Sequence, residues 1–91
     1  MSYTIQYTKE AEKVLKVWKK SNSLLFNKTI SILNDIMDHP RTGLGHPEPL
    51  VGSNNETYSR RISANHRIIY TIHDTEVLVI IIQLGNHYND K

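Results

Sequence analysis

The spacing of apolar residues changes near the middle of this chain of 91 residues, from a helical period to the denser pattern of strands. Two segments, at about 9–20 and 24–37, each place apolar side chains on one face of a helix. These side chains are Ala11, Val14, Leu15 and Trp18, then Phe26, Ile30, Leu33 and Met37. Helices that precede a run of strands favour an α+β fold.

The second half of the chain is rich in β-branched and aromatic residues. The strands predicted there are 57–63, 67–72 and 77–84. Short turns between them imply antiparallel hairpins, and a further short strand is expected at 3–8. A polar break at 21–23 joins the helices into an αα-hairpin. We predict one domain, 1–91, of order β-αα-βββ, with the hairpin on one face of an antiparallel sheet.

Composition excludes several classes of protein. Without cysteine, the chain forms no disulfide and performs no thiol redox chemistry. The longest apolar run, Val77–Ile82, is far shorter than the roughly 20 residues of a membrane-spanning helix. The N-terminus has no apolar signal core. These features predict a cytoplasmic protein with no membrane partner.

Basic residues are unevenly distributed, although the formal net charge is only +2. Arg60, Arg61 and Arg67 lie close together in the sequence, and lysines recur on one face of the first predicted helix. These lysines are Lys9, Lys13, Lys16 and Lys20. A basic surface favours a polyanionic partner, whereas a solvated lysine face is the other interpretation of the helix.

Residues 41–55 form a predicted loop that holds three of the four glycines and two of the three prolines. Glu48 lies between Pro47 and Pro49, which restrict the backbone on both sides of it. A carboxylate displayed on stiff backbone suits catalysis. An ordinary solvent-exposed glutamate is the alternative interpretation.

Arg67 begins a predicted strand, and His87 and Tyr88 follow the last one. Arg67 could hold a phosphate with its planar, permanently charged fork, or it could pair with a surface acid. His87 can donate or accept a proton near neutral pH. With Glu48 as base, Arg67 as cation and His87 as acid, RNA could be cleaved by its own 2′-hydroxyl without a metal or cofactor.

The remaining histidines do not suggest a metal site. A structural zinc site requires three or four closely spaced ligands, a pattern that these histidines lack. They are His39, His46, His66 and His73. His66 is predicted instead to shape a turn or to border the site.

Three motifs follow one another: G-x-G-x-P-E-P-L at 43–50, S-R-R-I-x-x-x-H-R-I-x-Y at 59–70, and the closing His87-Tyr88. Through them the chain resembles the Txe/YoeB toxins of the RelE-like superfamily over nearly its whole length. The resemblance implies a RelE-like microbial ribonuclease fold. It implies a ribosome-dependent endoribonuclease that cuts messenger RNA in the A site. It also implies a YefM-like antitoxin, whose C-terminal segment blocks the site, and a homodimer.

The resemblance also implies roles for single residues. The catalytic set is the general base Glu48, the phosphate-stabilising Arg67, the general acid His87 and the substrate-orienting Tyr88. The substrate-binding set is Arg61, Arg60 and His46. Where the family often has lysines, this chain has Leu44, His46 and Val51, which predicts weaker phosphate binding or more reliance on the arginines. A non-catalytic module that grips RNA or an acidic protein with the same basic face is the alternative.

The two arginines of the predicted hairpin can act together only if they share a face of the sheet. An odd number of residues in the loop would achieve this, with Ser63 opposite Arg67 and Arg61 opposite Ile69. An even loop would place them on opposite faces.

Overall fold

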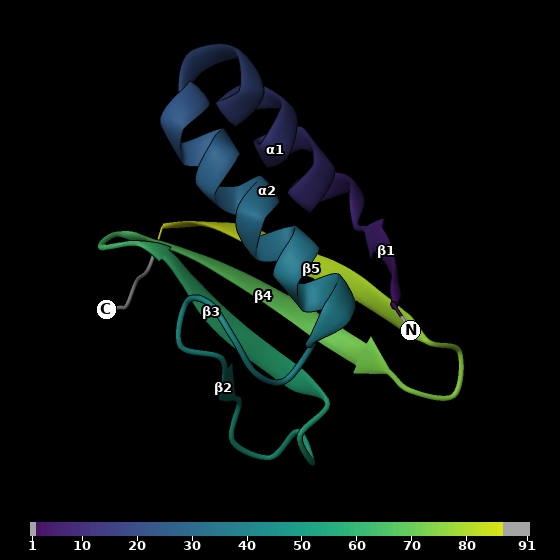
Figure 1. Cartoon of the computed structure of the whole chain (residues 1–91). Coiled ribbons are helices and arrows are strands. Elements are labelled where there is room, and N and C mark those ends of the chain that lie inside the picture. Colours follow the sequence, from purple (N-terminus) through teal and green to yellow (C-terminus); the bar gives the residue numbers. More distant parts are fainter. Residues whose placement is uncertain (1, 87–91) are drawn as a thin grey trace.

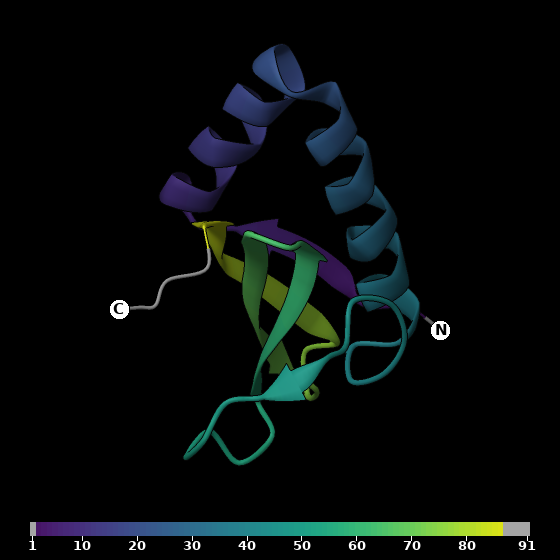
Figure 2. The same cartoon turned by 90° about the vertical axis from the view of Figure 1, so that its left-hand side faces the viewer.

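The computed structural model describes residues 2–86, in which one sheet is covered by a pair of helices. The helices are α1 (Lys9–Ser21) and α2 (Ser23–Asp38). The strands are β1 (Thr4–Tyr7), β2 (Glu48–Pro49), β3 (Thr57–Ser63), β4 (His66–His73) and β5 (Leu78–Asn86). The sheet order is β1-β5-β4-β3-β2, and both helices lie over the same face (Figures 1 and 2).

The predicted α+β class is confirmed, with two corrections to the sheet. The sheet is mixed, because β1 pairs in parallel with β5, placing Thr4 opposite Leu78. The loop also contributes a two-residue edge strand, β2, that was not predicted. The strands β1 and β5 are more than 70 residues apart, and β2 has only two residues, one of which is Pro49. Turn lengths could therefore indicate neither pairing. As expected, β5 is an interior strand.

Side-chain caps fix the helix ends. Thr8 accepts a hydrogen bond from the Ala11 N–H at the start of α1. Asn22 ends α1 and also caps α2, where its Oδ1 accepts from the Leu25 N–H at 3.1 Å. One asparagine in the predicted polar break therefore turns the chain and starts the second helix. Pro40 follows the end of α2, as expected from its effect on the preceding residue.

The core lies between the helices and one face of β3, β4 and β5. Ile68, Tyr70 and Ile72 of β4 alternate toward the helices and are buried. On α2 the buried face is Leu25, Thr29, Ile32, Leu33 and Ile36. The predicted stripe was therefore wrong in phase by about one residue: Leu33 is in the core, but Ile30 only borders it and Phe26 is half-buried outside it.

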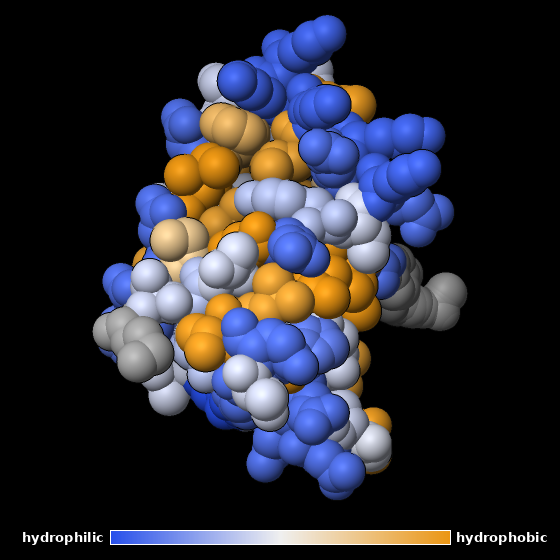
Figure 3. Space-filling view, turned by 90° about the vertical axis from the view of Figure 1, so that its right-hand side faces the viewer, coloured by the Kyte–Doolittle hydropathy of each residue, from blue (hydrophilic) through white to orange (hydrophobic). Residues whose placement is uncertain are grey.

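The lysines Lys9, Lys13, Lys16 and Lys20 are all exposed on α1. Seen from the side of α1 and β1, hydrophilic side chains gather over α1, and apolar surface is exposed beside it and across the middle of the molecule (Figure 3). Within residues 2–86, no helix combines the length and apolar character needed to cross a membrane.

Candidate active site

The strand register brings Glu48, Arg61 and Arg67 to the face of the sheet opposite the helices. Glu48 of β2 pairs with Ser59 of β3, and two residues further along β3 Arg61 pairs with Arg67 of β4. Directly paired residues of antiparallel strands project from the same face, and so do residues two apart on one strand. Glu48 is therefore a diagonal neighbour of Arg61, at about 7–8 Å, and Arg61 is a direct neighbour of Arg67, at about 5 Å. Glu48 and Arg67 lie on opposite sides of β3, with Arg61 between them. We call this side of the sheet the open face.

The register prediction for the hairpin was wrong in its details. The turn has two residues, Ala64 and Asn65, and pairs Ser63 with His66. Such an even turn would separate the arginines, but a β-bulge between Arg61 and Ser63 adds one residue to β3. The bulge restores the shared face and sets Arg61 directly opposite Arg67.

Two like charges thus face each other, and within residues 2–86 neither forms an ion pair. Arg61 is exposed and Arg67 half-buried, and neither guanidinium has a hydrogen-bond or ion-pair partner among residues 2–86. Directly opposed like charges destabilise a sheet. The pair therefore forms a positive site that an anion would stabilise. The exposed side chain of Glu48, likewise without a partner in this part of the chain, stands beside it on the edge strand.

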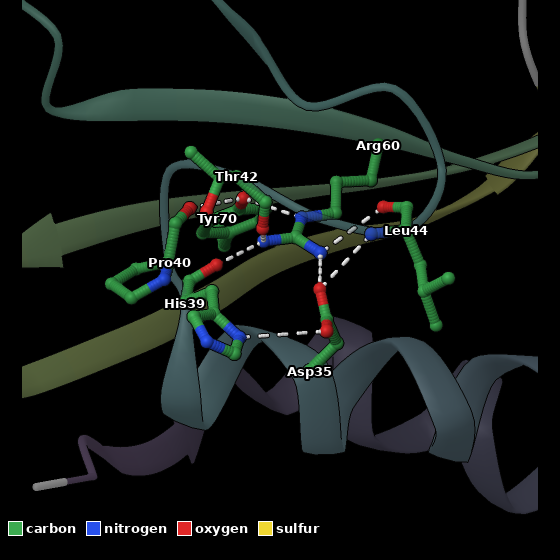
Figure 4. A network of polar contacts seen from close by, with 7 residues as sticks. All are labelled: Asp35, His39, Pro40, Thr42, Leu44, Arg60 and Tyr70. Atoms are coloured by element: carbon green, nitrogen blue, oxygen red, sulfur yellow. Dashed lines mark hydrogen bonds and ion pairs between the residues drawn. The ribbon is translucent and has the colours of Figure 1, made fainter.

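Arg60, the neighbour of Arg61, faces the other way and is fully buried. Its Nε donates to the Tyr70 hydroxyl at 2.9 Å, and one terminal nitrogen donates to Asp35 at 2.6 Å and to the Leu44 carbonyl at 3.1 Å. The other terminal nitrogen donates to the carbonyls of His39 and Thr42. All five donors of the guanidinium are thus used (Figure 4).

The prediction that Arg60 binds substrate is therefore wrong. A group with no exposed surface and no free donor cannot take a phosphate. The signal was present in the sequence: Arg60 and Arg61 are adjacent in a strand, so only one of them can project from the open face. Sequence reasoning missed its partners, Asp35 and Tyr70, because they are 25 and 10 residues away.

The charges of this network are fixed by its contacts. Burial acts to raise the pKa of Asp35, but hydrogen bonds from Arg60 and the Leu44 N–H, with the positive charge of Arg60, lower it below the ordinary value. Burial raises the pKa of Tyr70 despite the opposing hydrogen bond from Arg60. Asp35 is therefore ionised and Tyr70 protonated near neutral pH, and the Tyr70 hydroxyl donates to the Pro40 carbonyl at 2.6 Å.

The glycine loop needs glycine where it passes these groups. Gly45 has φ +79°, and a Cβ there would lie 2.6 Å from the carbonyl oxygen of Arg61. The Gly45 carbonyl in turn accepts from the Arg61 N–H at 2.7 Å. His46, a predicted substrate-binding residue, follows with φ 54° and an exposed side chain. The G-x-G-x-P-E-P-L motif thus fits the loop tightly against β3 just before Glu48.

The other candidate residues divide into those described and those not. His66 accepts or donates a 2.7 Å hydrogen bond to Ser63 across the two-residue turn and packs edge-on against Trp18, which confirms that it shapes the turn. Among residues 2–86, no group of three or more histidines, aspartates or glutamates could hold a metal ion. His87 and Tyr88 lie outside the described residues, so their catalytic roles stay predictions.

Comparisons with known proteins agree with the motif analysis. Residues 7–88 match the model of a family described as the YoeB-like toxin of bacterial type II toxin–antitoxin systems. A Toxin YoeB of Synechocystis is 38% identical over 65 residues, which cover 70% of this chain and 76% of the relative. A Toxin YoeB of Streptomyces coelicolor is 34% identical over 71 residues, covering 78% and 82%.

Solved structures extend the likeness to the fold. A YoeB/ParE toxin from Agrobacterium tumefaciens is 28% identical with a TM-score of 0.85, covering 93% of this chain and 99% of that one. The YoeB dimer from Staphylococcus aureus has a TM-score of 0.83 at 27% identity, covering 97% and 100%. A YoeB-YefM complex from the same organism has a TM-score of 0.81 at 28% identity, with the same coverage.

Proposed function

This chain belongs to the family of YoeB-like toxins of bacterial type II toxin–antitoxin systems, and from that premise we propose that it is a ribosome-dependent endoribonuclease. It cuts messenger RNA in the ribosomal A site and thereby stops translation in the cytoplasm. The reaction is attack by the 2′-hydroxyl and uses neither a metal nor a cofactor.

The observation that carries the proposal is the shared face of Glu48, Arg61 and Arg67. Glu48 removes the proton of the 2′-hydroxyl, and the 2′ oxygen forms a bond to phosphorus. The two arginines hold the phosphate and stabilise the extra negative charge of the transition state. The bond from phosphorus to the 5′ oxygen breaks, leaving a 2′,3′-cyclic phosphate on the upstream fragment.

The leaving 5′ oxygen needs a proton, and we assign its donation to His87. Tyr88 orients the substrate beside the scissile phosphate. His46, exposed in the loop two residues before Glu48, binds the substrate from the same edge of the sheet.

The family suggests the partners. The relatives from Staphylococcus aureus include a dimer and a complex with YefM. We propose that this chain forms a homodimer and that the C-terminal segment of a YefM-like antitoxin covers its open face. The uncompensated arginine pair suits an acidic segment of such an antitoxin as well as it suits RNA.

The test is growth arrest in a bacterium that lacks the antitoxin. Wild type is expected to arrest growth, whereas Glu48→Ala and His87→Ala are expected to relieve the arrest while folding normally. Glu76→Gln, an exposed glutamate in the turn between β4 and β5, is the matched control and should arrest like wild type. Arrest that persists in both variants would refute the catalytic assignment and favour a non-catalytic binding module.

A further inference from the structure

The buried Arg60 network lies directly behind the residues proposed for catalysis. Its neighbours on β3 are Ser59, which pairs with Glu48, and Arg61, which pairs with Arg67. Strand alternation sends Ser59 and Arg61 to the open face and Arg60 to the helix side. The Arg60 guanidinium thus lies between the two β3 residues that pair with Glu48 and Arg67, on the side of the sheet away from the substrate.

The loop that leads to Glu48 depends on this network for its shape. The carbonyls of His39, Thr42 and Leu44 accept from Arg60, and the Pro40 carbonyl accepts from Tyr70. Figure 4 shows these carbonyls converging on the two side chains, with Asp35 of α2 on the far side of the guanidinium. A planar fork with fixed donor directions specifies where each carbonyl must lie.

Asp35 also binds the loop directly, in addition to binding Arg60. Its Oδ2 accepts from Arg60 and also from the Leu44 N–H at 3.0 Å. A Cβ on Gly43 would lie 2.0 Å from the same oxygen, so the loop backbone passes in direct contact with the carboxylate. Asp35 is therefore shared between the guanidinium and the chain that the guanidinium holds.

The link from this loop to Glu48 is short and stiff. Gly45 is pinned by the Arg61 N–H, and three residues further on comes Glu48, between Pro47 and Pro49. Prolines fix φ and restrict the residue before them, so a displacement of the loop passes to Glu48 instead of being absorbed. Two paired residues of β2 are a weak anchor by themselves.

We propose that Arg60, Asp35 and Tyr70 form a positioning unit that sets the place of Glu48 relative to the arginine pair. The catalytic part of this inference rests on the function proposed above; the structural part, that the unit holds the loop, stands independently of it. The unit touches no substrate and acts only through the loop of residues 39–47.

Tyr70→Phe is the sharpest variant, because it deletes one hydroxyl that binds both Arg60 and the Pro40 carbonyl. Tyr58→Phe is the matched control: its ring stacks on Tyr70 at 6.2 Å, and its hydroxyl has no hydrogen bond within residues 2–86. Asp35→Asn is a second variant that keeps the shape of the side chain and removes its charge.

Amide hydrogen exchange tests the structural part. In Tyr70→Phe and Asp35→Asn, the amides between Gly43 and Glu48 should exchange about tenfold faster or more, while those of β4 and β5 keep wild-type rates. Tyr58→Phe should leave both sets unchanged. Loop amides at wild-type rates, or an equal acceleration throughout the sheet, would overturn the positioning unit.

Single-turnover cleavage of ribosome-bound messenger RNA tests the catalytic part. Tyr70→Phe should slow cleavage by about 10- to 100-fold with little change in ribosome affinity, because misplacing a catalytic group costs rate and not binding. In a Glu48→Gln background the same change should have almost no further effect. An equal factor in both backgrounds would refute action through Glu48. If Glu48→Gln alone left cleavage intact, the proposed function would fail, while the exchange measurement would still decide the structural part.

Discussion

Two adjacent arginines of β3 show the two uses that this fold makes of the same side chain. Arg60 is fully buried, and all five of its donors are paired. Arg61 is exposed, faces Arg67, and has no partner for its guanidinium within residues 2–86. A guanidinium whose donors are all paired stabilises the fold. A guanidinium whose donors are unpaired can bind an anionic ligand. Because successive side chains of a strand project from opposite faces of the sheet, two adjacent residues can have these two roles.

The largest expected effect is on the stability of the folded protein. Arg60→Met should lower the free energy of unfolding by about 3–5 kcal/mol, because it leaves Asp35 and the loop carbonyls without their buried partner. Arg61→Met should change it by no more than about 0.5 kcal/mol, as for most surface substitutions. Urea denaturation of both variants measures the difference. Equal losses would erase the distinction between the two arginines.

Deleting a single hydroxyl within the network should have a smaller effect. Tyr70→Phe should cost about 1–3 kcal/mol, because Arg60 loses an acceptor and the Pro40 carbonyl loses a donor. Tyr58→Phe removes a hydroxyl with no hydrogen bond in the described part of the chain and should be close to neutral. The same denaturation experiment compares them, and a cost for Tyr58→Phe as large as that for Tyr70→Phe would show that the network adds nothing.

Two arginine–aspartate pairs within residues 2–86, Arg60–Asp35 and Arg41–Asp74, should respond differently to acid. The pKa of Asp35 is lowered in the folded protein, so its ionised form stabilises the fold above about pH 4, the unfolded value, and this contribution is lost as the pH falls below it. Asp35→Asn should therefore flatten the acid limb of the stability curve.

Asp74 provides the comparison, since hydrogen bonds from Arg41 and Tyr3 also lower its pKa but its side chain is 55% exposed. Solvent weakens such exposed pairs, so Asp74→Asn should flatten the same limb less. Thermal unfolding followed between pH 2 and pH 6 measures both slopes. An Asp35→Asn curve parallel to that of wild type would contradict the role given to the buried pair.

The smallest expected effect concerns the open face. Arg61→Gln should raise stability at low salt by a few tenths of a kcal/mol, at the lower end of the about 0.2–1 kcal/mol typical of cross-strand pairs, by relieving repulsion from Arg67. The gain should fade in about 1 M salt, where charges are screened over about 3 Å. Lys20→Gln on α1 is the control and should show no such gain. A gain that is independent of salt would point to a cause other than charge.

Local patterns in the sequence predicted most of the fold. Helical spacing, the polar break at Asn22 and the proline at 40 placed both helices within a residue or two of their observed ends. The parallel pairing of β1 with β5 could not be predicted, because the paired residues are more than 70 residues apart and no short turn between the strands indicates their relative direction. The phase of α2 was missed because Thr29 is buried, its hydroxyl bonded to the Leu25 carbonyl, at a position that hydrophobicity alone assigns to the surface.

The candidate site was predictable in its residues but not in its geometry. The proline-flanked Glu48 and the arginines could be identified in the sequence. The bulge that sets Arg61 opposite Arg67 could not, because it follows from strand pairing and not from turn length. The separation of Arg60 from the site depends on Asp35 and Tyr70, which reach it from α2 and β4. Sequence motifs therefore identified a group of residues that the fold divides between the open face and the buried network behind it.

We expect the open face to cleave RNA through the neighbouring 2′-hydroxyl, and the chemical ends of the fragments test this most directly. Messenger RNA cut on the ribosome by wild type should carry a 2′,3′-cyclic phosphate upstream and a 5′-hydroxyl downstream, and a single 2′-deoxy substitution at the scissile nucleotide should abolish cleavage there. A 3′-hydroxyl with a 5′-phosphate, and undiminished cutting at the deoxy position, would contradict the mechanism.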